Sequence, residues 1–284
     1  MILAVVTPAR LWDWSYHPDP GVIDGIVVLT LLYILAVGPA RRWLAPQEKF
    51  SWLQASSFGL AQLILLFAVA SPLDEIAEQY LFSAHMAQHV LLLYPVPLLW
   101  LWGIPPWLLR IPFAMEWSAP IARALVRPAV AFVGFNALFY IWHIPGLYEW
   151  ALRDSKIHFL EHATFMGTSL LLWWPLLQPL PELPRLHPGW KLLYLLGGSI
   201  AQMPLLGILV FSQNVFYPTY RNAVRVTELS ALSDQQLGAV IMKLSAMVVM
   251  FSAMVIIFLR WYYSEEGRRP KARLPQTQPE LEKI

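Results

Sequence analysis

Residues 82–97, FSAHMAQHVLLLYPVP, place two histidines four positions apart in an apolar segment. In a helix, His85 and His89 lie on one face, about 6 Å apart along the axis. An imidazole in lipid needs a hydrogen-bond partner, a metal ion or a haem iron, because an unpaired polar group is costly there. The stretch therefore predicts a membrane-embedded helix with a functional site on one face.

The composition is that of an integral membrane protein. Of the 284 residues, 57% are hydrophobic and 13% are charged, and the mean hydropathy is +0.51. Soluble domains carry about 25% charged residues. The chain is therefore expected to lie in membrane lipid. Its net charge of +2 gives no indication of a nucleic-acid partner. The chain has no cysteine, which excludes disulfides, thiolate zinc sites and iron–sulfur clusters and leaves His, Met, Asp and Glu as metal ligands.

Seven apolar runs approach the roughly 20 residues that cross a bilayer core. We therefore predict an all-α, polytopic bundle of seven transmembrane helices over residues 1–262, followed by a polar, disordered cytoplasmic tail over residues 263–284. The predicted spans are residues 22–40, 52–71, 80–102, 128–145, 158–178, 190–213 and 237–261. Residues 105–128 mix apolar and basic side chains, which suits either a helix lying in the interface or a plain loop.

The distribution of basic residues predicts the orientation of this bundle. Of the 20 Lys and Arg residues, 14 lie in one set of alternate loops and five in the other, and Lys243 lies within the last span. The positive-inside rule then places the N-terminus outside and the C-terminus in the cytoplasm. We expect a multi-pass protein of a bacterial cytoplasmic (inner) membrane.

This topology brings five histidines to one depth on three spans. They are His85 and His89 in the third span, His143 at the outer end of the fourth, and His158 and His162 in the HFLEH sequence of the fifth. Such a group is able to hold one tetrahedral ion or two ions about one helical turn apart. Imidazole suits copper, zinc, iron and nickel. The sequence therefore predicts a metal or cofactor site in the outer leaflet.

Other side chains are candidates for supporting this site. Glu161 lies between two of the histidines and is either a ligand or an acceptor that orients an imidazole, and Gln88 and Tyr148 are further candidates for the orienting role. The thioethers of Met86 and Met203 would favour Cu(I).

Two further features are ambiguous. Lys243 in the last span either extends toward the surface or pairs with Asp24. The acidic segment at residues 74–78 is either solvated or collects cations at the entrance of the site.

Several motifs together resemble a known family. They are HMAQH at residues 85–89, WGIP at 102–105, WHIPGLYEWAL at 142–152, HFLEH at 158–162, LLWWP at 171–175 and DQQLGAVIM at 234–242. In these residues the chain resembles the polytopic CtaG family of cytochrome c oxidase assembly factors. Gly238-Ala239 and Lys243 depart from the double glycine and aromatic residue expected at the start of the last span.

The resemblance implies a role in the maturation of a haem–copper oxidase rather than an enzymatic activity. The expected partners are oxidase subunits or other copper-handling assembly factors, and the five clustered histidines match the family's recurrent histidines. Copper is the favoured metal, with zinc and haem as alternatives. A different class of function is a redox protein, either with bis-histidine haem or linked to quinone. A di-iron enzyme and a scaffold with purely structural histidines are two further alternatives.

Overall fold

The computed structural model describes residues 20–268, and this part of the chain is helical and contains no strand. In chain order its helices are α2 (Pro20–Val37), α3 (Arg41–Leu44), α4 (Trp52–Ala70), α5 (Pro72–Gln79), α6 (Phe82–Leu93), α7 (Pro95–Gly103), α8 (Pro106–Leu109), α9 (Ile111–Ala114), α10 (Ala119–Leu125), α11 (Pro128–Trp142), α12 (Pro145–Arg153), α13 (Ser155–Leu177), α14 (Pro188–Ala201), α15 (Met203–Phe211), α16 (Pro218–Asn222) and α17 (Ala231–Arg268).

Several of these helices have the length and composition of membrane spans. Within residues 20–268, four qualify, and they are α2, α4, the α14–α15 run Pro188–Phe211 and the Ala231–Ser264 part of α17. The pair α10 and α11, which meet at an angle of 72°, makes a fifth if it is counted as one bent span. The chain is thus an all-helical protein with four or five candidate spans by this criterion, fewer than the seven that the sequence predicts. The two remaining predicted spans coincide with α6–α7 and α13.

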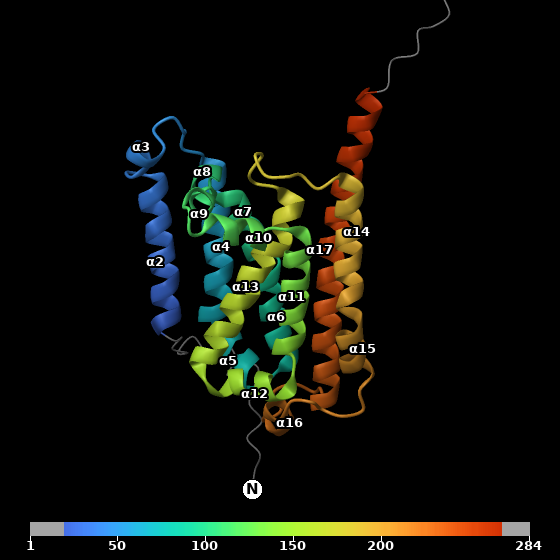
Figure 1. The fold of residues 1–284 in the computed structure, drawn as a ribbon. Helices are drawn as coiled ribbons and strands as arrows, with labels where there is room; N and C mark the ends of the chain where they lie inside the picture. Colours follow the sequence, from blue (N-terminus) through green and yellow to red (C-terminus); the bar gives the residue numbers. More distant parts are fainter. Residues whose placement is uncertain (1–19, 269–284) are drawn as a thin grey trace, which may run out of the picture.

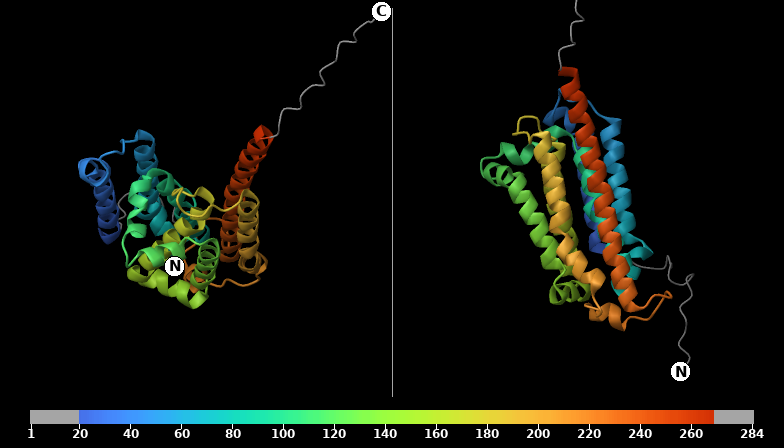
Figure 2. Two further views of the ribbon diagram at one scale, coloured as in Figure 1. Left: turned by 45° about the horizontal axis from the view of Figure 1, so that its top comes forward. Right: turned by 90° about the vertical axis from the view of Figure 1, so that its right-hand side faces the viewer.

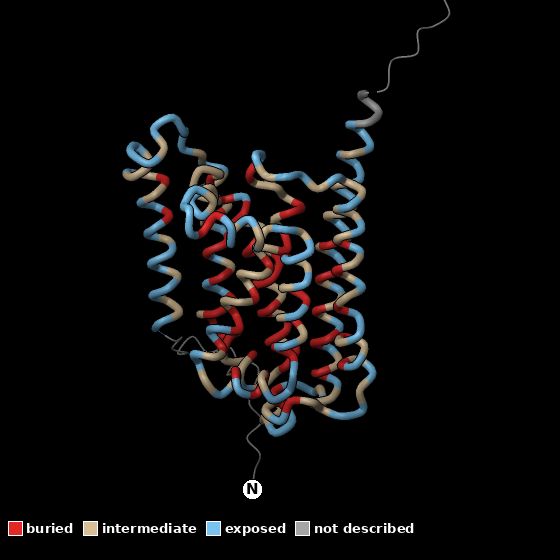
Figure 3. The backbone as a smooth tube through the Cα atoms, in the orientation of Figure 1, coloured by how far each residue is buried: buried red, intermediate tan, exposed pale blue. Residues whose placement is uncertain are grey.

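Helix α6 lies in the interior of the bundle. It packs against α17, α5, α4 and α13, and α13 packs in turn against α7, α11 and α12. Helix α2 lies on one flank against α4, whereas α14 and α15 lie on the other flank against α17 (Figures 1 and 2). Buried backbone is concentrated in the inner helices, while α2 is largely exposed (Figure 3). This arrangement places the two helices that carry histidine pairs next to each other in the core.

The third predicted span is not one continuous helix, because α6 ends at Leu93 and α7 begins at Pro95. Pro97 has no N–H and is therefore unable to donate to the carbonyl of Leu93, four residues earlier. The hydroxyl of Ser169 in α13 donates to this carbonyl instead. The break therefore removes a helical hydrogen bond and provides a polar contact between the two histidine-bearing segments.

The sixth predicted span is also interrupted. Helix α14 ends at Ala201 and α15 begins at Met203, with Pro204 in the first turn of α15. A proline is accommodated in a first turn because the amides there have no partner within the helix. The segment between the two helices is held from α11, since the Tyr140 hydroxyl donates to the Ala201 carbonyl at 2.6 Å.

Three connections also differ from the prediction. The fourth predicted span ends early, at Trp142, because Pro145 begins a separate helix, α12, that the sequence reading does not predict. Residues 105–128 form three short helices, α8, α9 and α10, and not one interfacial helix or a plain loop. The predicted tail begins too early, because α17 continues to Arg268, and residues 269–284 lie outside the described part of the chain.

Candidate metal centre

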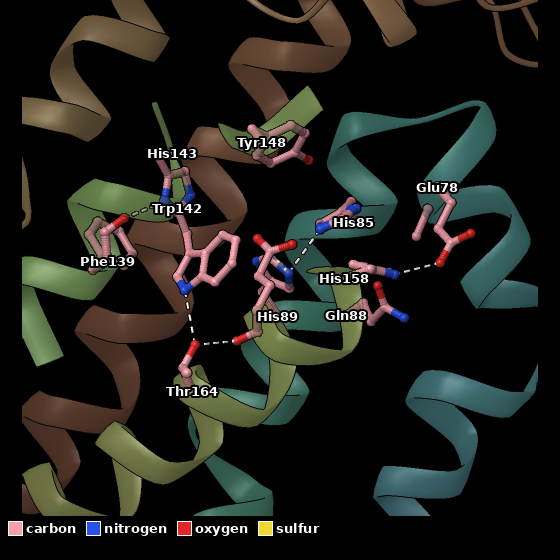
Figure 4. Close-up of polar contacts among 12 residues, drawn as sticks. Glu78, His85, Gln88, His89, Phe139, Trp142, His143, Tyr148, His158 and Thr164 are labelled. Atoms are coloured by element: carbon pink, nitrogen blue, oxygen red, sulfur yellow. Dashed lines mark hydrogen bonds and ion pairs between the residues drawn. The ribbon is translucent and has the colours of Figure 1, made fainter. Parts of the chain in front are cut away.

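Helix α6 carries His85 and His89 on one buried face. Their side chains are almost completely shielded from solvent, with exposures of 0% and 1%. The two Nε2 atoms lie 2.8 Å apart, close enough for a hydrogen bond if one imidazole donates (Figure 4). The four-residue spacing therefore produces direct contact between the two rings, as the sequence predicts.

The start of α6 is fixed by a carboxylate from the last helix. Asp234 of α17 accepts hydrogen bonds from the backbone N–H groups of Phe82 at 2.8 Å and Ser83 at 3.2 Å, and also from the Ser83 hydroxyl. These amides belong to the first turn, where a helix has no internal acceptor for its N–H groups. Asp234 is fully buried and thus anchors the turn that precedes His85.

Helix α13 supplies a second set of polar side chains from its first two turns. Asp154 caps this helix by accepting from the Lys156 amide at 2.9 Å. His158, Glu161 and His162 follow on its buried face. The rings of His158 and His162 have centroids 4.2 Å apart, and His162 lies 5.3 Å from His89.

The two helices together form sets of three possible metal ligands. Within residues 20–268, one set is His85, His158 and His162, and the other is His85, His89 and Glu161. In each set one ligand atom per residue lies within 4.8 Å of the others, and all of the side chains are buried. Because His85 belongs to both sets, the two sets adjoin each other and share one imidazole.

Three imidazoles have their Nδ1 atoms held by neighbouring groups. His158 Nδ1 lies 2.7 Å from a carboxylate oxygen of Glu78 in α5, and His143 Nδ1 lies 2.6 Å from the Phe139 carbonyl (Figure 4). Both oxygens are acceptors, so in both rings Nδ1 carries the proton and Nε2 has a free lone pair. This is the arrangement by which an outer acceptor orients a metal-bound imidazole.

His85 is held in the same way by a tyrosine. The Tyr220 hydroxyl of α16 donates to the Ala77 carbonyl at 2.7 Å, which leaves its oxygen to accept from His85 Nδ1 at 3.1 Å. The Tyr148 hydroxyl lies 3.1 Å from that of Tyr220. Burial raises the pKa of Tyr220 well above its usual value, so the phenol stays protonated. The network therefore leaves the Nε2 atom of His85 without a proton, so that it is able to accept from His89 Nε2 at 2.8 Å or to bind a ligand in place of that contact.

Several buried atoms of this cluster and of the nearby His143 have no hydrogen-bond partner among the described residues. They are Nε2 of His143, His158 and His162, Nδ1 of His89 and both carboxylate oxygens of Glu161. The closest charged contact of Glu161 is with His89, at 3.8 Å between Oε1 and Nε2. A buried polar group without a partner costs about 1–3 kcal/mol, and a charged one costs more. So many lone pairs in one small buried region are unusual in a folded protein.

A cavity of about 170 Å³ adjoins the cluster. Its polar lining includes Asp74, Glu78, His158 and His162, and its apolar lining comes from α2, α4, α7 and α13. The acidic segment of α5 therefore lies beside the histidines, with Glu78 in contact with one of them.

The sequence was compared with known proteins. The family model for the cytochrome c oxidase caa3 assembly factor matches residues 31–264, which is most of the chain and includes every residue of the cluster. The chain belongs to this family. No curated protein and no solved structure gives a significant match. The resemblance inferred from the histidine motifs is thus confirmed, and the family description is that of an assembly factor rather than an enzyme.

Not every residue proposed for the site of this assembly factor joins the cluster. His143 lies at the end of α11 with its ring 6.4 Å from that of Tyr148, and it belongs to neither set of three ligands. Met203 is half-exposed on α15 and lines a different groove, next to Lys243. Met86 is buried in the apolar core on the side of α6 that faces Gly238. The thioether argument for Cu(I) therefore loses its support.

Two other polar residues have structural contacts instead of the predicted ones. Gln88 donates to the Ala68 carbonyl at 2.8 Å and to Asp74 at 2.5 Å, so it connects α6 to α4 and α5 and does not orient a histidine. Lys243 donates to the carbonyl and the hydroxyl of Ser199, each at 3.2 Å, and not to Asp24.

Sequence reasoning missed three residues that position the cluster of the assembly factor. Glu78 appears only as part of an acidic segment, Tyr220 is not singled out, and Asp234 appears only within a family motif. Their partners His158, His85 and Phe82 lie far away in sequence. The sequence offered one signal, which is that Asp234 lies at the start of the last apolar span, where an acidic side chain is able to interact with helix amides.

Proposed function

We propose that this protein supports cytochrome c oxidase assembly by binding copper at the cluster and delivering it to an oxidase subunit or to another copper-handling factor. The ligands are His85, His158 and His162, with His89 and Glu161 as the adjoining set that shares His85. The single observation that carries the proposal is a group of imidazole and carboxylate atoms that are buried without hydrogen-bond partners. In His85 and His158, a neighbouring oxygen holds the Nδ1 atom, which directs Nε2 toward the cluster.

A metal ion accounts for this group better than a structural role. Histidines that only stabilise a fold have both nitrogens satisfied or exposed, because each buried orphan lowers stability. A cation would coordinate the free Nε2 atoms and neutralise the Glu161 carboxylate in surroundings where an isolated charge is costly. The donor set of imidazole and carboxylate fits copper or zinc. Copper is favoured because the family assembles a haem–copper oxidase.

The geometry does not favour the bis-histidine haem alternative. A haem between α6 and α13 needs an open plane between one imidazole from each helix, but the ring centroids of His85 and His158 are only 5.5 Å apart and those of His89 and His162 only 5.3 Å apart. The adjoining cavity of about 170 Å³ is also below the roughly 300–1,000 Å³ of pockets that hold drug-sized ligands. The space suits an ion that enters past Asp74 and Glu78.

The proposal includes a seven-span topology with the N-terminus outside and the C-terminus in the cytoplasm of a bacterial inner membrane. Three observations support it. Helices α6 and α7 cover residues 82–103, and α13 has 23 residues, so each rises about 33–35 Å at 1.5 Å per residue. Four of the polar side chains that lower the hydropathy of α13 are buried in the core, so lipid does not contact them; they are His158, Glu161, His162 and Ser169. Within residues 20–268, most Lys and Arg residues belong to segments at the end of the bundle opposite α5, α12 and α16.

The test is the metal content of purified protein, measured by elemental analysis after loading with copper and removal of unbound ions. We expect about one copper per chain in the wild type. His85→Ala should abolish binding, because this residue belongs to both ligand sets, whereas His89→Ala and His162→Ala each leave one set intact and should weaken it. His187→Ala is the matched control, because this histidine caps α14 at the other end of the bundle.

The same experiment distinguishes the alternatives. Wild type without bound metal, or equal copper in wild type and His85→Ala, would refute the copper site. Preferential retention of zinc from an equimolar mixture would replace copper by zinc. A Soret band lost in His85→Ala would support the haem reading instead. An oxidase-assembly assay in cells then tests delivery, since variants that lose copper should also lose assembled oxidase.

A further inference from the structure

A second, larger cavity lies at the end of the bundle opposite the histidines. It has a volume of about 590 Å³ and is enclosed by the bend between α10 and α11, the C-terminal end of α13 and the segment 178–186. The family match covers this region, but none of the residues that line the cavity belongs to the metal cluster. The copper proposal and the inference drawn here are therefore independent.

The cavity is lined by cations that have no counter-ion among residues 20–268. Arg123 and Arg127 lie on the α10–α11 side and Arg185 on the opposite side. None of these three side chains makes a hydrogen bond or ion pair with another described residue. The acidic residue in the lining, Glu182, is already paired with Arg110, with 2.5 Å between Oε1 and Nε. The cavity therefore has a net positive charge and attracts an anion.

A buried amide adds a hydrogen-bond donor to the same lining. Gln178 ends α13 in the left-handed conformation with φ of 49°, and its Oε1 accepts from the Lys191 ammonium at 3.1 Å. This contact identifies Nε2 as the other end of the side chain, and Nε2 is buried and has no partner among the described residues. An acceptor such as a phosphate oxygen would satisfy it.

The rest of the lining is apolar and continues onto the outer surface of the bundle. Trp174, Val126, Leu180, Leu183 and Leu186 line the cavity. On α10, next to this lining, Ile121 and Leu125 are 56% and 41% exposed. A free anion would gain no favourable interaction from these apolar side chains. A ligand with a charged head and hydrocarbon chains would contact the arginines and the apolar surface at once.

We propose that this cavity binds the headgroup and glycerol backbone of an anionic phospholipid. Its acyl chains run along the exposed apolar face of α10 and α11. Basic cavities between transmembrane helices on the cytoplasmic side recognise anionic lipids in this way, and each Lys or Arg near the surface strengthens the attraction about fivefold. The 72° bend between α10 and α11 creates the space, because it turns α10 away from the axis of the span.

The test is native mass spectrometry of the purified full chain in detergent, titrated with phosphatidylglycerol or with phosphatidylcholine of the same acyl chains. We expect one retained phosphatidylglycerol per chain, bound at least tenfold more tightly than phosphatidylcholine. Arg127→Gln/Arg185→Gln removes one cation from each side of the cavity and should weaken that binding about 30-fold. Arg42→Gln/Arg260→Gln is the matched control, because it removes two arginines outside the cavity.

Each remaining outcome contradicts the proposal. Equal binding of the two lipids by the wild-type protein would refute an anionic lipid site, and this comparison does not depend on any variant. An equal loss in the control variant would attribute the effect to general charge. Displacement of the lipid by millimolar glycerol 3-phosphate would show a site for a free phosphate ester and not for a lipid.

Discussion

Replacement of Asp234 by alanine should destabilise the assembly factor and empty its metal site at the same time. The carboxylate has no contact with the histidine cluster among the hydrogen bonds of residues 20–268. It acts on α6, where it accepts from two backbone amides and one hydroxyl. Because His85 lies in the turn that follows Phe82 and Ser83, loosening this turn displaces an imidazole that belongs to both ligand sets.

The size of the effect follows from these contacts. Loss of a helix cap costs about 1–2 kcal/mol, and stranding buried donors costs about 1–3 kcal/mol. Asp234 is fully buried, so water is unable to replace the carboxylate. We expect the free energy of unfolding to fall by about 2–4 kcal/mol. For a chain of this length that lowers the midpoint of thermal unfolding by about 5–10 °C.

The assay is thermal unfolding in detergent, followed by tryptophan fluorescence and combined with elemental analysis of the copper-loaded protein. Asp154→Ala is the matched control, because Asp154 caps the other histidine-bearing helix through one exposed hydrogen bond, and its loss should cost only about 0.5–1 kcal/mol. Similar midpoints for the two variants, or full copper content in Asp234→Ala, would refute the view that this buried cap positions His85.

Three further predictions follow from the same contacts. Glu78→Gln should weaken copper binding about 10–100-fold in a chelator-competition titration, because it removes the charge that orients His158. Glu75→Gln is the control and should leave the copper affinity unchanged. Equal affinities of the two variants would contradict the orienting role of Glu78. Gly103→Ala should lower the free energy of unfolding by about 1–3 kcal/mol, measured by thermal unfolding, because the new Cβ would lie 2.6 Å from the Phe58 backbone nitrogen. Gly59→Ala should not lower it, because a Cβ at that position would meet open space. Copper should stay bound when the pH is lowered from 7.5 to about 5.5 and should appear in a dialysate only at lower pH, because burial disfavours the charged imidazolium that would release it. Complete release at about pH 6 would argue against a buried histidine site.

The sequence predicts the histidine pairs correctly because their contact is local. A spacing of four residues brings His85 next to His89 and His158 next to His162 in any regular helix. The convergence of the two pairs needs only that the two helices be neighbours at matched depth. That depth follows from the alternation of apolar runs. The central part of the site is therefore readable from residue spacing.

The supporting residues are not predictable from spacing, because their contacts depend on tertiary packing. Asp234 is separated from Phe82 by 152 positions, and Tyr220 is separated from His85 by 135 positions. Met203 fails as a ligand for the same reason, since it belongs to α15, which packs against α17, and its side chain lines a groove beside Lys243. The prolines at positions 97 and 204 indicate where the two helices break, but the length of an apolar run, which is what predicts a span, does not register such a break.

The residues that hold the cluster in place come from short helices at one end of the bundle. Glu78 belongs to α5, Tyr148 to α12 and Tyr220 to α16, and Figure 1 shows these three helices together at the end where α6 and α13 begin. The long helices thus supply the ligands, while the short ones orient them and cover them. An ion held there would reach a partner most directly by displacement of the short helices, because α6 is fixed to α13 by Ser169 and to α17 by Asp234. On the copper proposal, the surface that contacts the recipient is therefore the one formed by α5, α12 and α16.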